Sequence, residues 1–124
     1  MNNTTRKILI IDDDSRNIFA LTAVLKAKNY TCISADSAEK GFRLMESNND
    51  IALVLMDIMM PDMDGYEAIA QMKTHPRLKH IPVIAVTAQA MLGDKERCLE
   101  AGAVSYISKP IRVDELVEEI NKHL

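Results

Sequence analysis

Ile51-Ala-Leu-Val-Leu-Met-Asp57-Ile-Met-Met-Pro61-Asp-Met-Asp-Gly65 is the stretch that decides the fold of this chain. Its opening run is apolar with no alternating polar side chain, which is typical of a strand buried on both faces, as in parallel sheets covered by helices. The run ends at Asp57, and Pro61 and Gly65 then force a loop. A carboxylate therefore lies where a buried strand meets a loop, which in open α/β sheets is where ligands bind.

Composition and charge restrict the function before any motif is considered. The 124 residues predict a single domain over 1–124, with 1–6 as a polar leader. The net charge of −3 and the lack of a Lys/Arg cluster disfavour direct nucleic-acid binding. No apolar run is long enough for a membrane span and the leader lacks a signal-peptide core, so we expect no membrane insertion and a cytoplasmic location. Cys32 and Cys98 form no paired motif and are interpreted as reduced thiols.

Hydrophobic periodicity predicts five strands that alternate with five helices. The strands are expected over 7–11, 30–35, 51–57, 81–86 and 104–107, and the helices over 15–28, 36–47, 66–75, 92–101 and 113–124. We expect Asp36 and Glu39 to form a capping box at the start of the second helix. The alternation predicts an α/β fold with a doubly wound, five-stranded parallel sheet and helices on both faces, the flavodoxin-like (βα)5 architecture.

Polar side chains follow four of the predicted strands: Asp12 and Asp13 after the first, Asp57 after the third, Thr87 after the fourth and Lys109 after the fifth. If the second strand lies outside the first, the three carboxylates flank the point where the winding direction reverses. Two unit charges about 4 Å apart repel by roughly 4 kcal/mol at an effective dielectric near 20, so such a cluster requires a cation or protonation. Magnesium suits a shallow carboxylate cage that leaves positions open for a phosphate oxygen. With an amine and a hydroxyl nearby, the pattern predicts phosphoryl transfer to a carboxylate.

These residues, in this order, closely resemble a known family. The landmarks are Asp12-Asp13, Asp57-x-x-Met60-Pro61-x-Met63-Asp64-Gly65, Thr87-Ala88 and Lys109-Pro110. Together they resemble the receiver domain of two-component response regulators, the CheY-like family, over essentially the whole chain. The sequence style is similar to that of receivers in stand-alone regulators and in hybrid histidine kinases, and these two settings both stay open.

The resemblance implies a role for each matching residue. Asp57 would be the phosphoacceptor. Its phosphoryl group would come from a histidine kinase or a histidine phosphotransfer protein that docks near the first helix. Magnesium, or manganese as a substitute, would be bound by Asp12, Asp13, Asp57 and the backbone carbonyl of Met59. The phosphoryl group would be bound by Thr87, Ala88 and Lys109, and the switch residues would be Thr87 and Tyr106. The peptide bond between Lys109 and Pro110 would be cis. An unknown output partner would bind the face built from the fourth helix, fifth strand and fifth helix, and the domain would signal without acting as a turnover enzyme.

Two other functions remain open at this point. Asp12-x-Asp14 resembles the motif of haloacid-dehalogenase-like phosphatases, in which Asp12 would be the nucleophile, although the chain is short and has no cap insertion. A flavodoxin-like flavin-binding module would share the fold, but three aspartates after the first strand would repel a phosphate. Taken singly, Asp14, Asp62 and Asp64 are interpreted as helix caps or turn residues.

Overall fold

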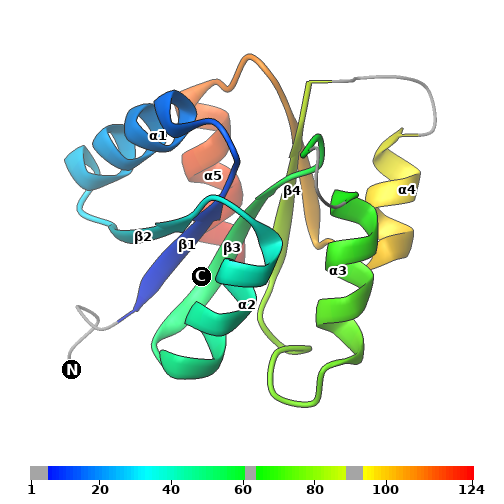
Figure 1. The fold of residues 1–124 in the computed structure, drawn as a ribbon. Coiled ribbons are helices and arrows are strands. Elements are labelled where there is room, and N and C mark those ends of the chain that lie inside the picture. Colours follow the sequence, from blue (N-terminus) through cyan, green and yellow to red (C-terminus); the bar gives the residue numbers. More distant parts are fainter. Residues whose placement is uncertain (1–5, 61–63, 89–93) are drawn as a thin grey trace.

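The chain forms one sheet covered by helices on both faces in a computed structural model, which describes residues 6–60, 64–88 and 94–124 (Figure 1). The elements are β1 (Lys7–Ile11), α1 (Ser15–Ala27), β2 (Thr31–Ala35), α2 (Ala38–Ser47), β3 (Ile51–Asp57), α3 (Gly65–Thr74), β4 (Val83–Thr87), α4 (Asp94–Ala101), β5 (Ser105–Ser108) and α5 (Val113–His123). All strand pairs are parallel, in the order β2-β1-β3-β4-β5. The fold prediction is confirmed, and the winding direction reverses between β1 and β3.

The apolar residues of the central strands divide between two cores because successive side chains of a strand point to opposite faces. Ile8 and Ile10 pack in one cluster with Leu25 of α1 and with Leu116 and Ile120 of α5. Leu9 and Ile11 of β1 belong to the second cluster. This cluster also contains Met45 of α2, Ile69 and Met72 of α3 and Cys98 of α4. Figure 1 shows the same division, with α1 and α5 on one face of the sheet and α2, α3 and α4 on the other. Every residue of β3 except Ala52 is buried, as a strand covered on both faces requires.

Aspartate and serine side chains cap three of the helices. Asp14 accepts a hydrogen bond from the Arg16 N–H at the start of α1, and Asp64 accepts one from the Tyr66 N–H at the start of α3, so both are helix caps as expected. Asp62 lies outside the described residues.

The capping box at Asp36 and Glu39 is wrong. Ser37 is the cap of α2, and its hydroxyl accepts a hydrogen bond from the Lys40 N–H at 3.1 Å. Both Asp36 and Ser37 have side chains that are able to cap a helix. Ser37 has the extended backbone that a cap needs, with φ −152° and ψ 159°. Asp36 instead forms an exposed ion pair with Lys40 at 2.9 Å.

Several predicted boundaries also shift. β4 begins at Val83 rather than at 81 because Ile81 is held in the preceding turn, where its N–H donates to the Leu78 carbonyl. The following Pro82 has no N–H to give to the sheet. β5 runs one residue later than predicted, from Ser105 to Ser108. Pro61 and Leu92, the predicted loop breaker and helix start, lie outside the described residues. In the part of the chain that is described, no helix combines the length and the apolar character that crossing a membrane needs.

Candidate functional site

Three carboxylates meet at the carboxyl edge of the two central strands. β1 and β3 are neighbours with Ile11 opposite Met56, so the aspartates that follow these residues lie beside each other. Asp12 and Asp57 are buried, at 3% and 4% exposure, and Asp13 is exposed. One carboxylate oxygen from each lies within 4.8 Å of the others. The structure thus brings together the acidic residues that the sequence placed at this edge.

Backbone and side-chain donors hold the two buried carboxylates in place. Asp12 Oδ1 accepts the Asp14 N–H at 2.9 Å, and its Oδ2 accepts from Asn17 Nδ2 at 3.4 Å. Asp57 Oδ1 accepts the Met59 N–H at 3.1 Å. Asn17 has no role in the sequence-based site, yet it is the side chain on α1 that reaches Asp12. Its position five residues after Asp12, in the first turns of α1, is the signal that could have identified it.

Lys109 supplies positive charge to the same edge. Its Nζ lies 3.7 Å from Asp57 Oδ1 and 3.9 Å from Asp12 Oδ2. The backbone directs it there, because the Lys109 N–H donates to the Thr87 carbonyl at 2.7 Å. The Lys109–Pro110 peptide bond is cis. The side chain is 24% exposed, so the pairing is only partly screened by water.

The electrostatics of the edge favour a cation. Burial, followed by the neighbouring charge of Asp12, raises the pKa of Asp57, and the Met59 N–H and Lys109 oppose this change, so that the pKa is about 6. Three carboxylates against one ammonium leave an excess of negative charge. The donors are all hard oxygens and one of the carboxylates is exposed, which fits a divalent ion such as magnesium that keeps part of its water.

The remaining predicted residues surround this cluster. Thr87 is fully buried at the end of β4, where the register places Val86 opposite Asp57, and Ala88 follows it as an exposed residue. Met59 is 50% exposed and pairs with Asp64 across the loop. Tyr106 lies in β5, opposite Ala85 of β4 and so further from the carboxyl edge of the sheet. Its side chain is half-buried against the core that α2, α3 and α4 cover. The structure therefore groups all of these residues near Asp57 except Tyr106, which lies behind them.

Gly65 allows the start of α3 to approach the end of β3 closely. A Cβ at this position would lie 2.5 Å from the Ile58 Cα, closer than any side chain tolerates. The Gly65 N–H donates to the Ile58 carbonyl at 3.1 Å, which holds the start of α3 against the end of β3. The glycine is needed for this close backbone approach, since its φ is not in the left-handed region.

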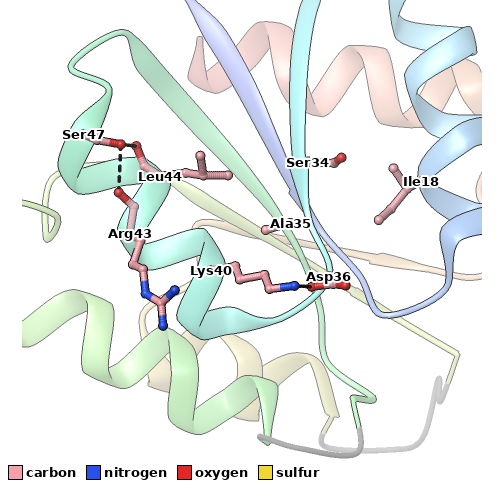
Figure 2. Close-up of a pocket in the computed structure, with 8 residues that line it drawn as sticks. All are labelled: Ile18, Ser34, Ala35, Asp36, Lys40, Arg43, Leu44 and Ser47. Carbon is pink, nitrogen blue, oxygen red and sulfur yellow. Dashed lines mark hydrogen bonds and ion pairs between the residues drawn. The ribbon is translucent and has the colours of Figure 1, made fainter.

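A separate hollow lies at the β2 edge of the sheet, between α1 and α2 (Figure 2). Its apolar wall includes Ile18, Ala35 and Leu44, and its cationic Lys40 is already paired with Asp36 at 2.9 Å. Its lining includes none of the clustered carboxylates at the ends of β1 and β3. We therefore assign the chemistry to the carboxylate cluster.

Comparison with known proteins identifies the family. The sequence model of the response regulator receiver domain matches residues 8–121. The chain belongs to this receiver domain family. It is 38% identical over 120 residues to the polar-differentiation response regulator DivK of Brucella ovis, covering 97% of each chain.

Solved receivers have the same fold. A putative response regulator from Chloroflexus aurantiacus superimposes with a TM-score of 0.88 at 31% identity, covering 94% of this chain and 95% of the other. The receiver domain of a sensor histidine kinase from Pseudomonas aeruginosa gives a TM-score of 0.85 at 30% identity, covering 95% and 96%, and has a magnesium ion in its active site cleft. The prediction of a receiver is confirmed, and none of these relatives favours the haloacid-dehalogenase-like alternative.

Proposed function

We propose that this receiver accepts a phosphoryl group on Asp57 from a phosphohistidine of a histidine kinase or a histidine phosphotransfer protein. One observation carries the proposal. Asp57 is buried at the end of β3, in a cluster of three carboxylates, with the Lys109 ammonium 3.7 Å from its Oδ1. A lone turn aspartate would be solvated and would need neither a second buried carboxylate nor a lysine beside it.

The chain's own residues divide the work of the transfer. An Asp57 carboxylate oxygen forms the new bond to phosphorus while the phosphorus–nitrogen bond of the donor breaks, and the donor imidazole keeps the electron pair. Lys109 holds one phosphoryl oxygen, and the Thr87 hydroxyl and Ala88 N–H hold others. Asn17 and the Asp14 N–H keep the Asp12 carboxylate oriented toward the cluster.

The acidic cluster fits a magnesium ion. Asp12, Asp13, Asp57 and the backbone carbonyl of Met59 are the residues that would hold it, with manganese as a substitute. When bound, the metal supplies positive charge that offsets the carboxylates and the phosphoryl oxygens. Asp13 is the exposed member of the set, so it lies on the side from which the ion and the donor protein arrive.

Phosphorylation would then be read at the surface of a single receiver domain over 1–124, with 1–6 as its leader. Thr87 and Tyr106 are the switch residues. The output partner binds the face built from α4, β5 and α5, and the kinase or phosphotransfer protein docks near α1. The domain catalyses its own phosphorylation and dephosphorylation without turning over a substrate. We place the exchange in the cytoplasm, where thiols such as Cys32 and Cys98 stay reduced.

Intact mass spectrometry after incubation with acetyl phosphate tests the proposal. We expect a gain of one phosphoryl group that requires magnesium and disappears in Asp57→Asn. Asp64→Asn is the matched control, because it removes an exposed carboxylate from the far end of the same loop and leaves the acceptor in place. No gain in the wild type overturns the proposal. Multiple turnover on p-nitrophenyl phosphate that is lost in Asp12→Asn and kept in Asp57→Asn would instead identify a phosphatase.

A further inference from the structure

Asp94 is a buried carboxylate that the proposed phosphotransfer does not use. It begins α4, is only 6% exposed and accepts a hydrogen bond on Oδ1 from the Tyr66 hydroxyl. Its Oδ2 is buried and has no hydrogen-bond partner among the described residues. A buried charged oxygen without a partner is costly, so a native structure that keeps one needs a reason.

Tyr66 and Asp94 connect α4 to the loop that follows the phosphoacceptor. Tyr66 comes directly after Gly65, whose backbone is packed against Ile58 at the end of β3. The Arg97 guanidinium lies 4.0 Å from the centroid of the Tyr66 ring, a cation–π contact between α4 and α3. Since Asp94 and Cys98 are the only buried residues of α4, these polar contacts fix the position of its first turn.

Tyr106 lies on β5, the strand that packs against α4. Its ring packs against the core cluster that also receives the Tyr66 ring. Burial, followed by the nearby charge of Asp94, raises the pKa of Tyr106. Tyr66 and Tyr106 therefore border the same core cluster, which also contains Cys98 of α4.

We propose that Asp94 is a positioning residue for the receiver switch: Tyr66 fixes one carboxylate oxygen, and the other accepts the Tyr106 hydroxyl when that side chain turns inward. This inference rests on the proposed function, because it takes Tyr106 as a switch residue and Asp57 as the phosphoacceptor. It explains why Oδ2 is buried and unpartnered in the present arrangement. The Tyr66 hydrogen bond orients the carboxylate, so the inward position of Tyr106 finds its acceptor already in place.

Fluorine NMR on protein labelled with 3-fluorotyrosine tests this directly, because the chain has three tyrosines. The Tyr30 hydroxyl donates a hydrogen bond to Asn121 Oδ1, and its fluorine signal serves as the internal reference. Single Tyr→Phe variants assign the three fluorine signals. Magnesium with beryllofluoride serves as the phosphoryl mimic. Asp94→Asn keeps an oxygen for Tyr66 and replaces the second oxygen by an amide that cannot accept a hydrogen bond. In the wild type, we expect the fluorine signal of Tyr106 to change its chemical shift when magnesium and beryllofluoride are added. We expect Asp94→Asn to lose most of this change and to bind beryllofluoride about fivefold more weakly, the lower end of usual coupling between sites.

Controls separate this role from loss of folding and from failure of the proposed function. Glu96→Gln removes an exposed charge from the same turn of α4 and is expected to match the wild type. Tyr106→Phe should weaken beryllofluoride binding by a similar factor, and adding Asp94→Asn to it should weaken binding no further; additive losses refute the inference. Wild-type behaviour of Asp94→Asn refutes it while the proposed function stands. Failure of the wild type to bind beryllofluoride with magnesium refutes both.

Discussion

Replacing Asp57 by asparagine is expected to stabilise the metal-free protein. In the absence of a cation, the folded state must hold the Asp57 charge in a site where it is 4% exposed and faces Asp12. Asparagine has nearly the same shape and can still accept the Met59 N–H, but it carries no charge. The substitution therefore removes the unfavourable part of the site and leaves its packing unchanged.

The magnitude follows from the pKa of Asp57. Burial and Asp12 raise it from 3.8 to about 6, so folding favours the protonated carboxyl and wild-type stability falls as pH rises between these values. At about 1.4 kcal/mol for each unit of pKa, ionisation costs the wild type about 3 kcal/mol above pH 6. The asparagine variant avoids this cost. We expect its advantage to be under about 1 kcal/mol at pH 4 and close to 3 kcal/mol at pH 7.5.

Urea unfolding in EDTA at pH 4, 5.5 and 7.5 measures the advantage. Asp13→Asn is the control, because it removes an exposed carboxylate from the same cluster and should change the free energy of unfolding by less than about 0.5 kcal/mol. Magnesium should narrow the gap at pH 7.5 by stabilising the wild type more than the variant. Equal stabilities at pH 7.5, or a gap that does not change with pH, would refute the electrostatic reasoning.

Three further predictions concern residues around the site. Gly65→Ala should destabilise the fold by about 1–3 kcal/mol in urea unfolding, because the added methyl meets the Ile58 Cα at 2.5 Å; unchanged stability contradicts the close approach. Asn17→Ala should weaken magnesium binding in calorimetry by about tenfold through loss of the Asp12 contact, and an unaltered affinity shows that Asn17 plays no part. Met59 is apolar and 50% exposed beside Asp57, so Met59→Asn should change the rate of phosphoryl loss, measured by mass spectrometry, by at least about threefold; an equal rate rules out an effect of this position on water.

The sequence predicts best where a single physical constraint acts. An uninterrupted apolar run has one stable place in a small α/β protein, the middle of a covered sheet, and β3 occupies it. The carboxylate cluster follows from the same constraint, because parallel strands deliver their final residues to one edge. Where two neighbouring residues can do the same task, as Asp36 and Ser37 can at the start of α2, the sequence does not decide between them and the backbone geometry does.

The contacts that the sequence could not predict join residues that no local rule connects. Tyr66 and Asp94 are 28 positions apart on different helices, and separately each reads as an ordinary helix residue. The structure makes them neighbours because β4 lies between the two helices in sequence and places α4 beside α3.

Two unfavourable features of the resting receiver lie at opposite ends of one short connection. At one end Asp57 carries a charge that its surroundings resist, and at the other Asp94 keeps a buried oxygen without a partner among the described residues. Ile58 and Gly65 link the two through direct backbone contact. Local violations of this kind are expected where a protein is built to change state, since a group that is already satisfied gains nothing from the change. A ligand that neutralises the Asp57 charge and favours the arrangement in which Asp94 Oδ2 has a partner shifts the population toward that arrangement. The proposed phosphorylation of Asp57 would in this way have a physical route to α4.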